Sequence, residues 1–302
     1  MFYKQKDWLR RWVFDRQVKA ILQSQPLELG DMGSPQVLSQ LQHKDVLMYL
    51  AAIKSFALHV PPGGVHIVDD GSLTAEDRAL LAQQVPGMRF LALEDCREPG
   101  LPAGGTWERL TAIARLSQNH YVIQLDADTL TRGPIDEVAT AALANRAFTI
   151  GTWNGQTIET ACERAEQTRA RNASMRHVQM LAEAHFDRLS EAESLKYVRG
   201  CSGFSGFPAG SGKLELMRSL SSQLQQLIGD KWREWGSEQV MSNLIVANQP
   251  DAVVLPHPDY ADCEKMQPDL SRFVHFIGTC RFRGGYYADM INRLDWKKRV
   301  EP

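Results

Sequence analysis

The chain has 302 residues, of which 43% are hydrophobic, and its formal net charge is −2. This length allows one large α/β domain or two modest ones, and the charge excludes a global attraction to nucleic acid. No stretch approaches the roughly 20 apolar residues of a membrane span, and no apolar run precedes a small-residue cleavage site, so we expect a cytoplasmic protein.

The cysteines give no sign of a metal or disulfide scaffold. They are five in number, scattered and without C-x-x-C spacing: Cys96, Cys162, Cys201, Cys263 and Cys280. This pattern argues against a structural zinc site or a disulfide framework, and it fits a reducing cytosol.

The first predicted element is a helical extension over residues 1–30. Residues 2–22 are basic and rich in aromatic and aliphatic side chains, and Trp8 and Trp12, four apart, share one helix face. Such a helix can lie on an anionic membrane, which allows the protein to be peripherally bound at the inner face of the membrane. We favour a helix that packs its aromatic stripe on the rest of the protein, as surface helices usually do.

From residue 36 onwards, apolar patterns with the period of strands alternate with patterns that have the period of helices. Thr74 can cap one of the helices, with Asp77 at the capping-box position. The alternation indicates βαβ units and a mainly parallel sheet flanked by helices. The predicted strands cover 36–41, 65–68, 88–93 and 121–125, and the predicted helices cover 45–58, 75–84 and 107–118.

The second half of the chain is less regular. Residues 158–199 are polar and helix-rich, and we expect a helical insertion there. The glycines around 200–211 could mark a boundary, yet the strands that follow are too few for an independent domain. We therefore predict one domain over residues 31–302. Its remaining strands are expected at 147–153, 253–256 and 273–278, and its remaining helices at 212–228 and 237–248.

The strand at 121–125 runs into Asp126-Ala127-Asp128. Side chains two apart in an extended segment lie on the same face, so the two carboxylates can converge just past the strand. A divalent ion such as Mg²⁺ or Mn²⁺ would relieve their repulsion and leave positions for phosphate oxygens. This predicts a metal–diphosphate site at the carboxyl end of a strand. For the triplet alone, a turn with solvated or capping carboxylates is the simpler interpretation.

Three further clusters bear on this hypothesis. Asp69-Asp70-Gly71-Ser72 ends a strand and could read a nucleobase or merely cap the next helix. His275 could ligate a metal and Arg281 could pair with a phosphate, or they could be a buried histidine and a solvated arginine. The polar run 237–243 opens a helix and could cap it or point into a cleft.

The order and spacing of these clusters resemble the GT-A nucleotide-sugar glycosyltransferases. The nearest group is the retaining one that includes glycogenin and bacterial lipopolysaccharide galactosyltransferases. Asp126-Ala127-Asp128 matches its D-x-D, residues 238–243 match in part its D-Q-D-x-x-N, and His275, Gly278 and Arg281 match its H-x-x-G-x-x-K. Arg281 replaces the family lysine, and Val240 replaces a family aspartate.

The resemblance implies a Rossmann-like GT-A fold and a glycosyltransferase of the hexosyltransferase type. Its donor would be a nucleoside-diphosphate sugar of the UDP or GDP type, and its acceptor is not named by any motif. Asp126, Asp128 and His275 would hold Mn²⁺ or Mg²⁺, and Gly278 and Arg281 would belong to the diphosphate site.

Further roles follow from the same resemblance. Asp69 or Asp70 would read the nucleobase, as in inverting relatives with a D-D-G-S turn. Gln239 would lie close to the anomeric carbon, and Glu238 would hold sugar hydroxyls or the acceptor. An inverting mechanism needs a general base, for which Glu238 is the candidate, whereas a retaining mechanism needs none there. The sequence leaves both mechanisms open.

Two other functions compete with this one. The Asp126 to Leu130 string also resembles the first motif of haloacid-dehalogenase-type phosphatases, in which Asp126 would be the nucleophile and Asp128 the acid/base. That family needs a later lysine, for which Lys231 is the nearest candidate, and its nucleophile strand normally comes first in the core. The third function is a nucleotide-sugar-binding protein without turnover.

Overall fold

The structure of the protein is a computed structural model that describes residues 2–31, 33–171 and 176–296. The chain forms two compact units. Unit 1 comprises Met1–Leu91, Leu125–Ala139 and Pro258–Pro302, and unit 2 comprises Ala92–Gln124 and Thr140–His257. The predicted division into an extension and one domain stays a prediction.

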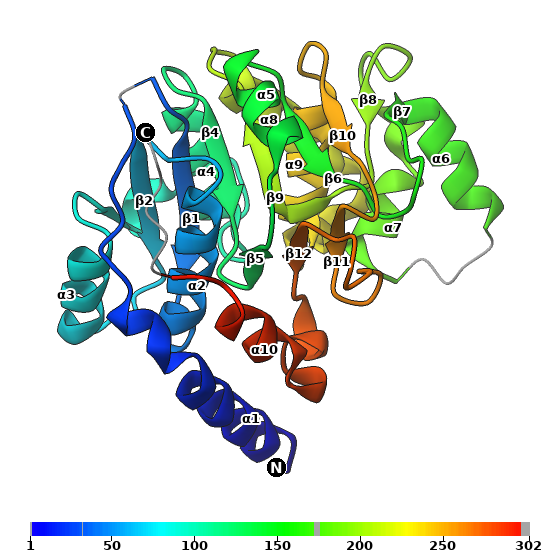
Figure 1. Ribbon diagram of the computed structural model, residues 1–302. Helices are drawn as coiled ribbons and strands as arrows, with labels where there is room; N and C mark the ends of the chain where they lie inside the picture. Colours follow the sequence, from blue (N-terminus) through cyan, green and yellow to red (C-terminus); the bar gives the residue numbers. More distant parts are fainter. Residues whose placement is uncertain (1, 32, 172–175, 297–302) are drawn as a thin grey trace. The chain divides into compact units, whose positions relative to one another are not determined.

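The main sheet has seven strands, which run in the order β1-β2-β3 within unit 1 and β10-β6-β9-β4 within unit 2. β1 pairs with β2 in parallel and β10 pairs with β6 in parallel, whereas β6 and β9 are antiparallel. Helices flank the strands (Figure 1). This mixed, mainly parallel sheet confirms the α/β fold class predicted from the sequence.

Unit 1 holds the strands and helices at both ends of the chain, together with a second sheet in the order β11-β12-β5. Its strands are β1 (Gln36–Leu41), β2 (Gly64–Asp69), β3 (Arg89–Ala92, whose last residue belongs to unit 2), β5 (Thr129–Thr131), β11 (Tyr260–Asp262) and β12 (Phe273–His275). Its helices are α1 (Phe2–Val18), η1 (Lys19–Gln23), η2 (His43–Asp45), α2 (Val46–Ala57), α3 (Ala75–Gln84), η6 (Gly278–Gly285) and α10 (Tyr286–Asn292), and α5 (Asp136–Leu143) begins in it.

Local sequence accounts for these elements of unit 1. Both halves of the capping box between Thr74 and Asp77 are formed, and α3 starts at Ala75 as predicted. α2 is apolar around most of its circumference, and nearly all of its residues are buried. β1 covers the predicted residues, with Val37, Leu38 and Leu41 fully buried.

The N-terminal helix α1 packs on a different face from the one expected. Phe14 and Val18 are buried, and Phe14 contacts the ring of Tyr287 in α10 at 5.0 Å between ring centroids. Trp8 and Trp12 are 66% and 45% exposed. The expectation that the tryptophan stripe packs on the protein is therefore wrong, because the smaller row of Phe14 and Val18 provides the packed side.

Unit 2 holds the middle of the chain. Its strands are β4 (Val122–Leu125, whose last residue belongs to unit 1), β6 (Phe148–Ile150), β7 (Glu159–Thr160), β8 (Lys196–Tyr197), β9 (Cys201–Phe207) and β10 (Val253–Leu255). Its helices are η3 (Glu94–Cys96), α4 (Trp107–Leu116), α6 (Ala161–Ala170), α7 (Val178–Glu183), η4 (Phe186–Arg188), α8 (Lys213–Ile228), η5 (Gly229–Arg233) and α9 (Ser237–Ala247).

The glycine-rich stretch after residue 200 is a strand of the sheet and not a boundary. β9 pairs with β6, and Gly206 lies opposite Phe148. A Cβ at Gly206 would collide with the ring of Phe148 and the hydroxyl of Tyr121. Glycine allows side chains of neighbouring strands to approach the backbone closely at this position. Amino-acid composition alone does not distinguish such a glycine from one in a linker. None of the helices among the described residues is both long and apolar enough to cross a bilayer.

Candidate functional site

Asp126 and Asp128 lie just past the carboxyl end of β4, in the short turn that leads to β5. The turn is fixed at both ends. The Ser39 hydroxyl donates to the Leu125 carbonyl at 2.5 Å, and the Thr129 hydroxyl donates to the Asp126 carbonyl at 2.8 Å. Asp126 is partly exposed and Asp128 is buried. The predicted convergence of the two carboxylates just past the strand is what this turn produces.

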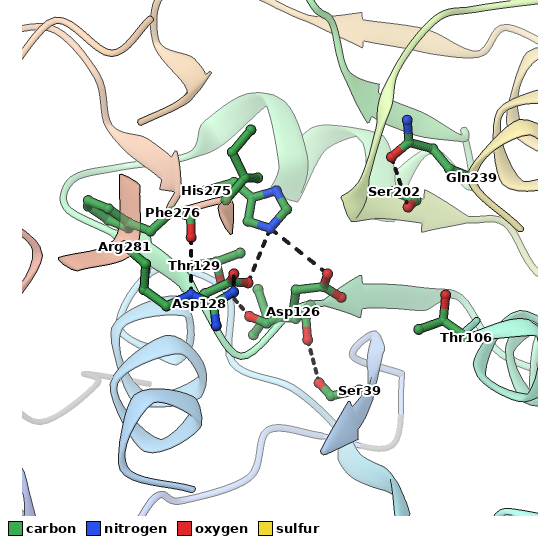
Figure 2. Close-up of polar contacts among 12 residues, drawn as sticks. Ser39, Thr106, Asp126, Asp128, Thr129, Ser202, Gln239, His275, Phe276 and Arg281 are labelled. Atoms are coloured by element: carbon green, nitrogen blue, oxygen red, sulfur yellow. Dashed lines mark hydrogen bonds and ion pairs between the residues drawn. The ribbon is translucent and has the colours of Figure 1, made fainter. Parts of the chain in front are cut away.

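His275 reaches the two carboxylates through strand pairing. β12 runs antiparallel to β5 with Thr129 opposite His275, and the Phe276 amide donates to the Asp128 carbonyl at 2.7 Å. The imidazole Nε2 is then 3.1 Å from Asp128 Oδ1 and 3.9 Å from Asp126 Oδ2. Figure 2 shows the ring pointing towards both carboxylates. The register of this ladder therefore brings together residues 147 positions apart.

Arg281 completes the group from η6. One guanidinium nitrogen is paired with Asp128 Oδ2, and its Nε donates to the Phe276 carbonyl at 3.4 Å. Gly278, three residues before Arg281, has a φ of 52°, a left-handed conformation that glycine adopts at little cost. Arg281 can then turn back to Asp128.

The electrostatics of Asp128 follow from these contacts. Burial alone would raise its pKa, but His275 and Arg281 outweigh that effect and hold the pKa well below its ordinary value. Burial would likewise lower the pKa of Arg281, yet Asp128 and Asp45 raise it above its ordinary value. Both groups are therefore charged at neutral pH.

The donor set fits a divalent metal ion. Asp126, Asp128 and His275 each offer one ligand atom, and these atoms lie within 4.8 Å of one another. Two carboxylates and an imidazole suit Mn²⁺ or Mg²⁺, and a three-ligand set leaves coordination positions for oxygens of another molecule. Arg281, beside the same carboxylate, adds a fixed positive charge for an anionic ligand.

Two residues of unit 1 that hold Arg281 and its helix are not predicted by the sequence. Asp45, at the start of α2, has its Oδ1 at 3.9 Å from a guanidinium nitrogen of Arg281. Arg11 of α1 donates to the same Asp45 oxygen at 2.8 Å. A chain of charged groups thus runs from α1 to Asp128. No signal in the sequence links these positions, because they are distant and carry no shared motif.

Unit 2 contains a second group of predicted residues, centred on Glu238 at the start of α9. Glu238 is only 3% exposed and is paired with Arg109 of α4 at 3.3 Å. The Thr106 hydroxyl donates to the same carboxylate at 2.9 Å. Arg109 was also missed, although an arginine directly before the mainly apolar stretch Leu110–Ala114 of the same helix is a signal for a buried charge pair.

Gln239 follows Glu238 and shares a partner with it. The Ser202 hydroxyl of β9 lies 3.4 Å from Gln239 Oε1 (Figure 2). The same hydroxyl lies 3.5 Å from Glu238 Oε2. The Trp107 indole donates to the Ser237 hydroxyl at 2.9 Å, which holds the start of α9 against the start of α4. Both predicted residues therefore lie in one ordered polar cluster of unit 2.

Asp69 and Asp70 have their carboxylates engaged in local structure. Asp69 accepts from the Gly71 amide at 2.8 Å and is paired with Arg78. Asp70 accepts from the amide and the hydroxyl of Ser72 at 2.9 and 2.6 Å. These are contacts within the turn between β2 and α3, as in the alternative interpretation, while Thr74 provides the cap of α3. A base-reading role for either residue stays a prediction.

One cysteine pair corrects the expectation of reduced thiols. Cys263 and Cys280 form a disulfide with their Cα atoms 6.2 Å apart. Cys263 follows β11 and Cys280 precedes Arg281, so the parallel pairing of β11 with β12 brings the two segments together. Their separation of 17 residues in the sequence did not reveal this pairing.

Comparison with known proteins places the fold. No family model and no curated protein sequence matches the chain. Among solved structures, the bifunctional glycosyltransferase WbbM in its apo form is 10% identical, with a TM-score of 0.53 over 90% of this chain and 52% of WbbM. The glycosyltransferase GlyE of Streptococcus pneumoniae is 12% identical, with a TM-score of 0.51 over 87% of this chain and 61% of GlyE.

The chain has a glycosyltransferase fold. This confirms the GT-A fold class predicted from the motifs. A variant of the galactosyltransferase LgtC also matches, at 14% identity and a TM-score of 0.48 over 85% of this chain and 95% of LgtC. The chain spans about half of the WbbM structure and less than two thirds of GlyE. In this fold, Asp126 and Asp128 lie just past the end of β4.

Proposed function

We propose that the chain is a metal-dependent glycosyltransferase that moves a sugar from a nucleoside-diphosphate sugar to an acceptor hydroxyl. The observation that carries the proposal is the convergence of Asp126, Asp128 and His275 beside Arg281 in unit 1. Transfer of a sugar leaves negative charge on the departing diphosphate. A divalent ion held by the three ligands would neutralise that charge when bound.

The residues of the chain contribute binding and orientation. Asp126 and Asp128 supply the carboxylates, and β5–β12 pairing holds His275 in register with them. Arg281 supplies a planar pair of donors for diphosphate oxygens, in place of the single ammonium of the family lysine. Gly278 allows the backbone to turn before Arg281.

In unit 2 we assign Gln239 to the neighbourhood of the reacting sugar and Glu238 to its hydroxyls. The Arg109 guanidinium contacts both oxygens of Glu238 and fixes the orientation of the carboxylate. The carboxylate oxygens are thereby engaged as hydrogen-bond acceptors, a role that also suits them to the hydroxyls of a sugar. This favours the mechanism that needs no base at this position.

The donor is of the UDP or GDP type, and its acceptor is either dissolved or carried by a membrane lipid. A membrane contact through residues 2–22, allowed by the sequence, would favour the second kind of acceptor. The phosphatase alternative has no support from Lys231. That residue is half exposed and pairs with Glu234 three residues on, as a surface lysine would.

The test is binding of UDP and GDP by the full chain, with and without Mn²⁺, measured by calorimetry and by thermal shift. We expect one nucleotide to bind only with metal. Asp128→Ala and His275→Ala should weaken this binding by about 100-fold, because each removes a metal ligand. His120→Ala, at an exposed histidine in unit 2, is the control and should bind like the parent.

Arg281 allows a graded variant in the same assay. Arg281→Lys keeps the charge but loses the planar pair of donors, and we expect roughly tenfold weaker nucleotide binding, with Arg281→Ala weaker still. Slow release of nucleoside diphosphate from the matching nucleotide sugar should accompany binding. Metal-dependent nucleotide binding that survives unchanged in both Asp128→Ala and His275→Ala would exclude the proposed function.

A further inference from the structure

The outer side of α1 carries a row of exposed, large apolar side chains. Trp8, Leu9, Trp12 and Val13 are 66%, 52%, 45% and 41% exposed. Positions 8, 9, 12 and 13 are neighbours on one side of a helix, so the four side chains form one continuous surface. We call this surface the Trp8–Val13 face. Four such residues together are unusual on a surface, where single exposed apolar residues are common.

The helix cannot bury this face by rolling over, because its other side is fixed. Phe14 is 3% exposed and its ring lies 5.6 Å from that of Phe282 and 5.0 Å from that of Tyr287. Arg11 donates to Asp45 and stacks over the Phe282 ring at 5.2 Å. The inner side of α1 therefore belongs to the core of unit 1, and Figure 1 shows α1 beside α10.

Basic side chains border the Trp8–Val13 face. Arg10 and Arg16 are exposed, and the Arg16 guanidinium lies 4.8 Å above the ring of Trp12. Arg10 and Arg283 also line a hollow of about 540 Å³ together with Phe282 and Gly284. Two guanidinium groups around one hollow are suited to a phosphate, which accepts paired hydrogen bonds from each.

We propose that the Trp8–Val13 face binds the surface of an anionic phospholipid bilayer, with a lipid phosphate in the hollow between Arg10 and Arg283. Tryptophan favours the boundary between acyl chains and headgroups, where its ring is apolar and its N–H remains hydrated. Arginines bordering such a surface reach the headgroups and add electrostatic attraction to anionic lipids. The charge of this border favours a bilayer over an apolar protein partner.

The experiment is co-sedimentation of the full chain with vesicles, without nucleotide or metal. Vesicles of phosphatidylcholine with about one-third phosphatidylglycerol should bind the chain at least tenfold more tightly than pure phosphatidylcholine, and salt should weaken that binding. Trp8→Ser with Trp12→Ser should lower binding at least tenfold. Arg10→Gln with Arg283→Gln should reduce binding to the level seen with uncharged vesicles.

The matched control removes exposed apolar side chains elsewhere. Leu143 and Leu270 are 90% and 54% exposed, and their replacement by serine should leave vesicle binding unchanged. Circular dichroism confirms that each variant is folded. The proposal is overturned if the parent chain stays in the supernatant, or if the double tryptophan variant binds like the parent.

A third outcome would also overturn it. If light scattering shows a dimer that dissociates in the double tryptophan variant, a second copy of the chain covers the Trp8–Val13 face. Because the vesicle assay contains neither nucleotide nor metal, its failure leaves the proposed function standing. Loss of the proposed function would equally leave the vesicle result unchanged.

Discussion

Asp128 has the most demanding position of any residue in the candidate site. Its carboxylate receives the imidazole of His275 on one oxygen and the guanidinium of Arg281 on the other. Buried and doubly paired, it is stabilised in its ionised form. The same carboxylate that would bind a metal therefore also holds two parts of unit 1 together.

This dual role predicts a pH-dependent contribution to stability. In metal-free buffer at neutral pH, Asp128→Asn should lower the free energy of unfolding by about 1–3 kcal/mol, because Arg281 and His275 lose their charged partner. The folded-state pKa of Asp128 is depressed, so its stabilising effect is full above the unfolded pKa and is lost as pH falls through the folded pKa.

Urea unfolding at a series of acidic pH values measures this. The gap between parent and variant should be constant at neutral pH and close progressively in acid. Asp230→Asn, at an exposed carboxylate, provides the control for the general effect of acid. A gap that stays constant into strong acid would contradict the assignment of a depressed pKa.

Side chains of the site differ in how far sequence predicts them. Strand periodicity predicts that Asp126 and Asp128 lie together, and His275 is predicted by its motif with Gly278 and Arg281, which comes after the D-x-D in the order seen in the family. Arg109 and Asp45 do not, because their partners Glu238 and Arg281 are far away in the chain and the pairing depends on how helices pack. For Asp69 and Asp70, in contrast, the local sequence predicts the observed contacts, because both carboxylates accept hydrogen bonds within the turn that follows β2.

Among the elements, α1 shows how a helix can have two apolar sides with different roles. One side carries Phe14 and Val18 and is buried, while the other carries the Trp8–Val13 face and is exposed. Periodicity alone finds both sides and cannot rank them. The prediction chose the side with the two tryptophans because their side chains are larger. The buried side is instead the one on which Phe14 packs against the rings of Phe282 and Tyr287.

This difference can be measured as stability. Phe14→Ala should lower the free energy of unfolding by about 2–4 kcal/mol, since it leaves a cavity against two rings. Trp8→Ala should change it by no more than about 0.5 kcal/mol, because Trp8 is 66% exposed. Urea unfolding of the two variants side by side makes the comparison. Equal losses would mean that the Trp8–Val13 face is packed in solution.

Other elements were predictable to within a residue or two. β1 and α3 begin and end as their patterns predict, because alternating apolar residues and a capping box are local signals. β9 was not predictable, since its glycines are explained only by the side chains of Phe148 and Tyr121 that approach them. Local sequence signals therefore predict where these elements begin and end, whereas the structural role of a glycine depends on which distant side chains pack against it.

At the scale of the whole molecule, each unit is assembled from separate stretches of chain. Within unit 1, the disulfide between Cys263 and Cys280 ties β11 to η6 around the strand that carries His275. A covalent link of this kind restricts the unfolded chain and so stabilises the folded one.

Reduction should therefore be measurable. For a separation of 17 residues we expect reduction to lower the free energy of unfolding by about 2–3 kcal/mol. Urea unfolding with and without a reductant gives the difference, and Cys263→Ser with Cys280→Ser should be insensitive to the reductant. Two reactive thiols at these positions in the oxidised protein would contradict the pairing.

The strand register that joins Asp128 to His275 also sets the order in which the protein can become competent. Asp128 leaves the ribosome 147 residues ahead of its histidine partner. Until β12 and η6 have emerged, the nascent chain has two neighbouring carboxylates without the imidazole and guanidinium that complete the site. A chain broken off after residue 257 would contain all of unit 2 and no His275 or Arg281. The stretch that is synthesised after unit 2 is thus the one that would give the site its affinity for metal and diphosphate.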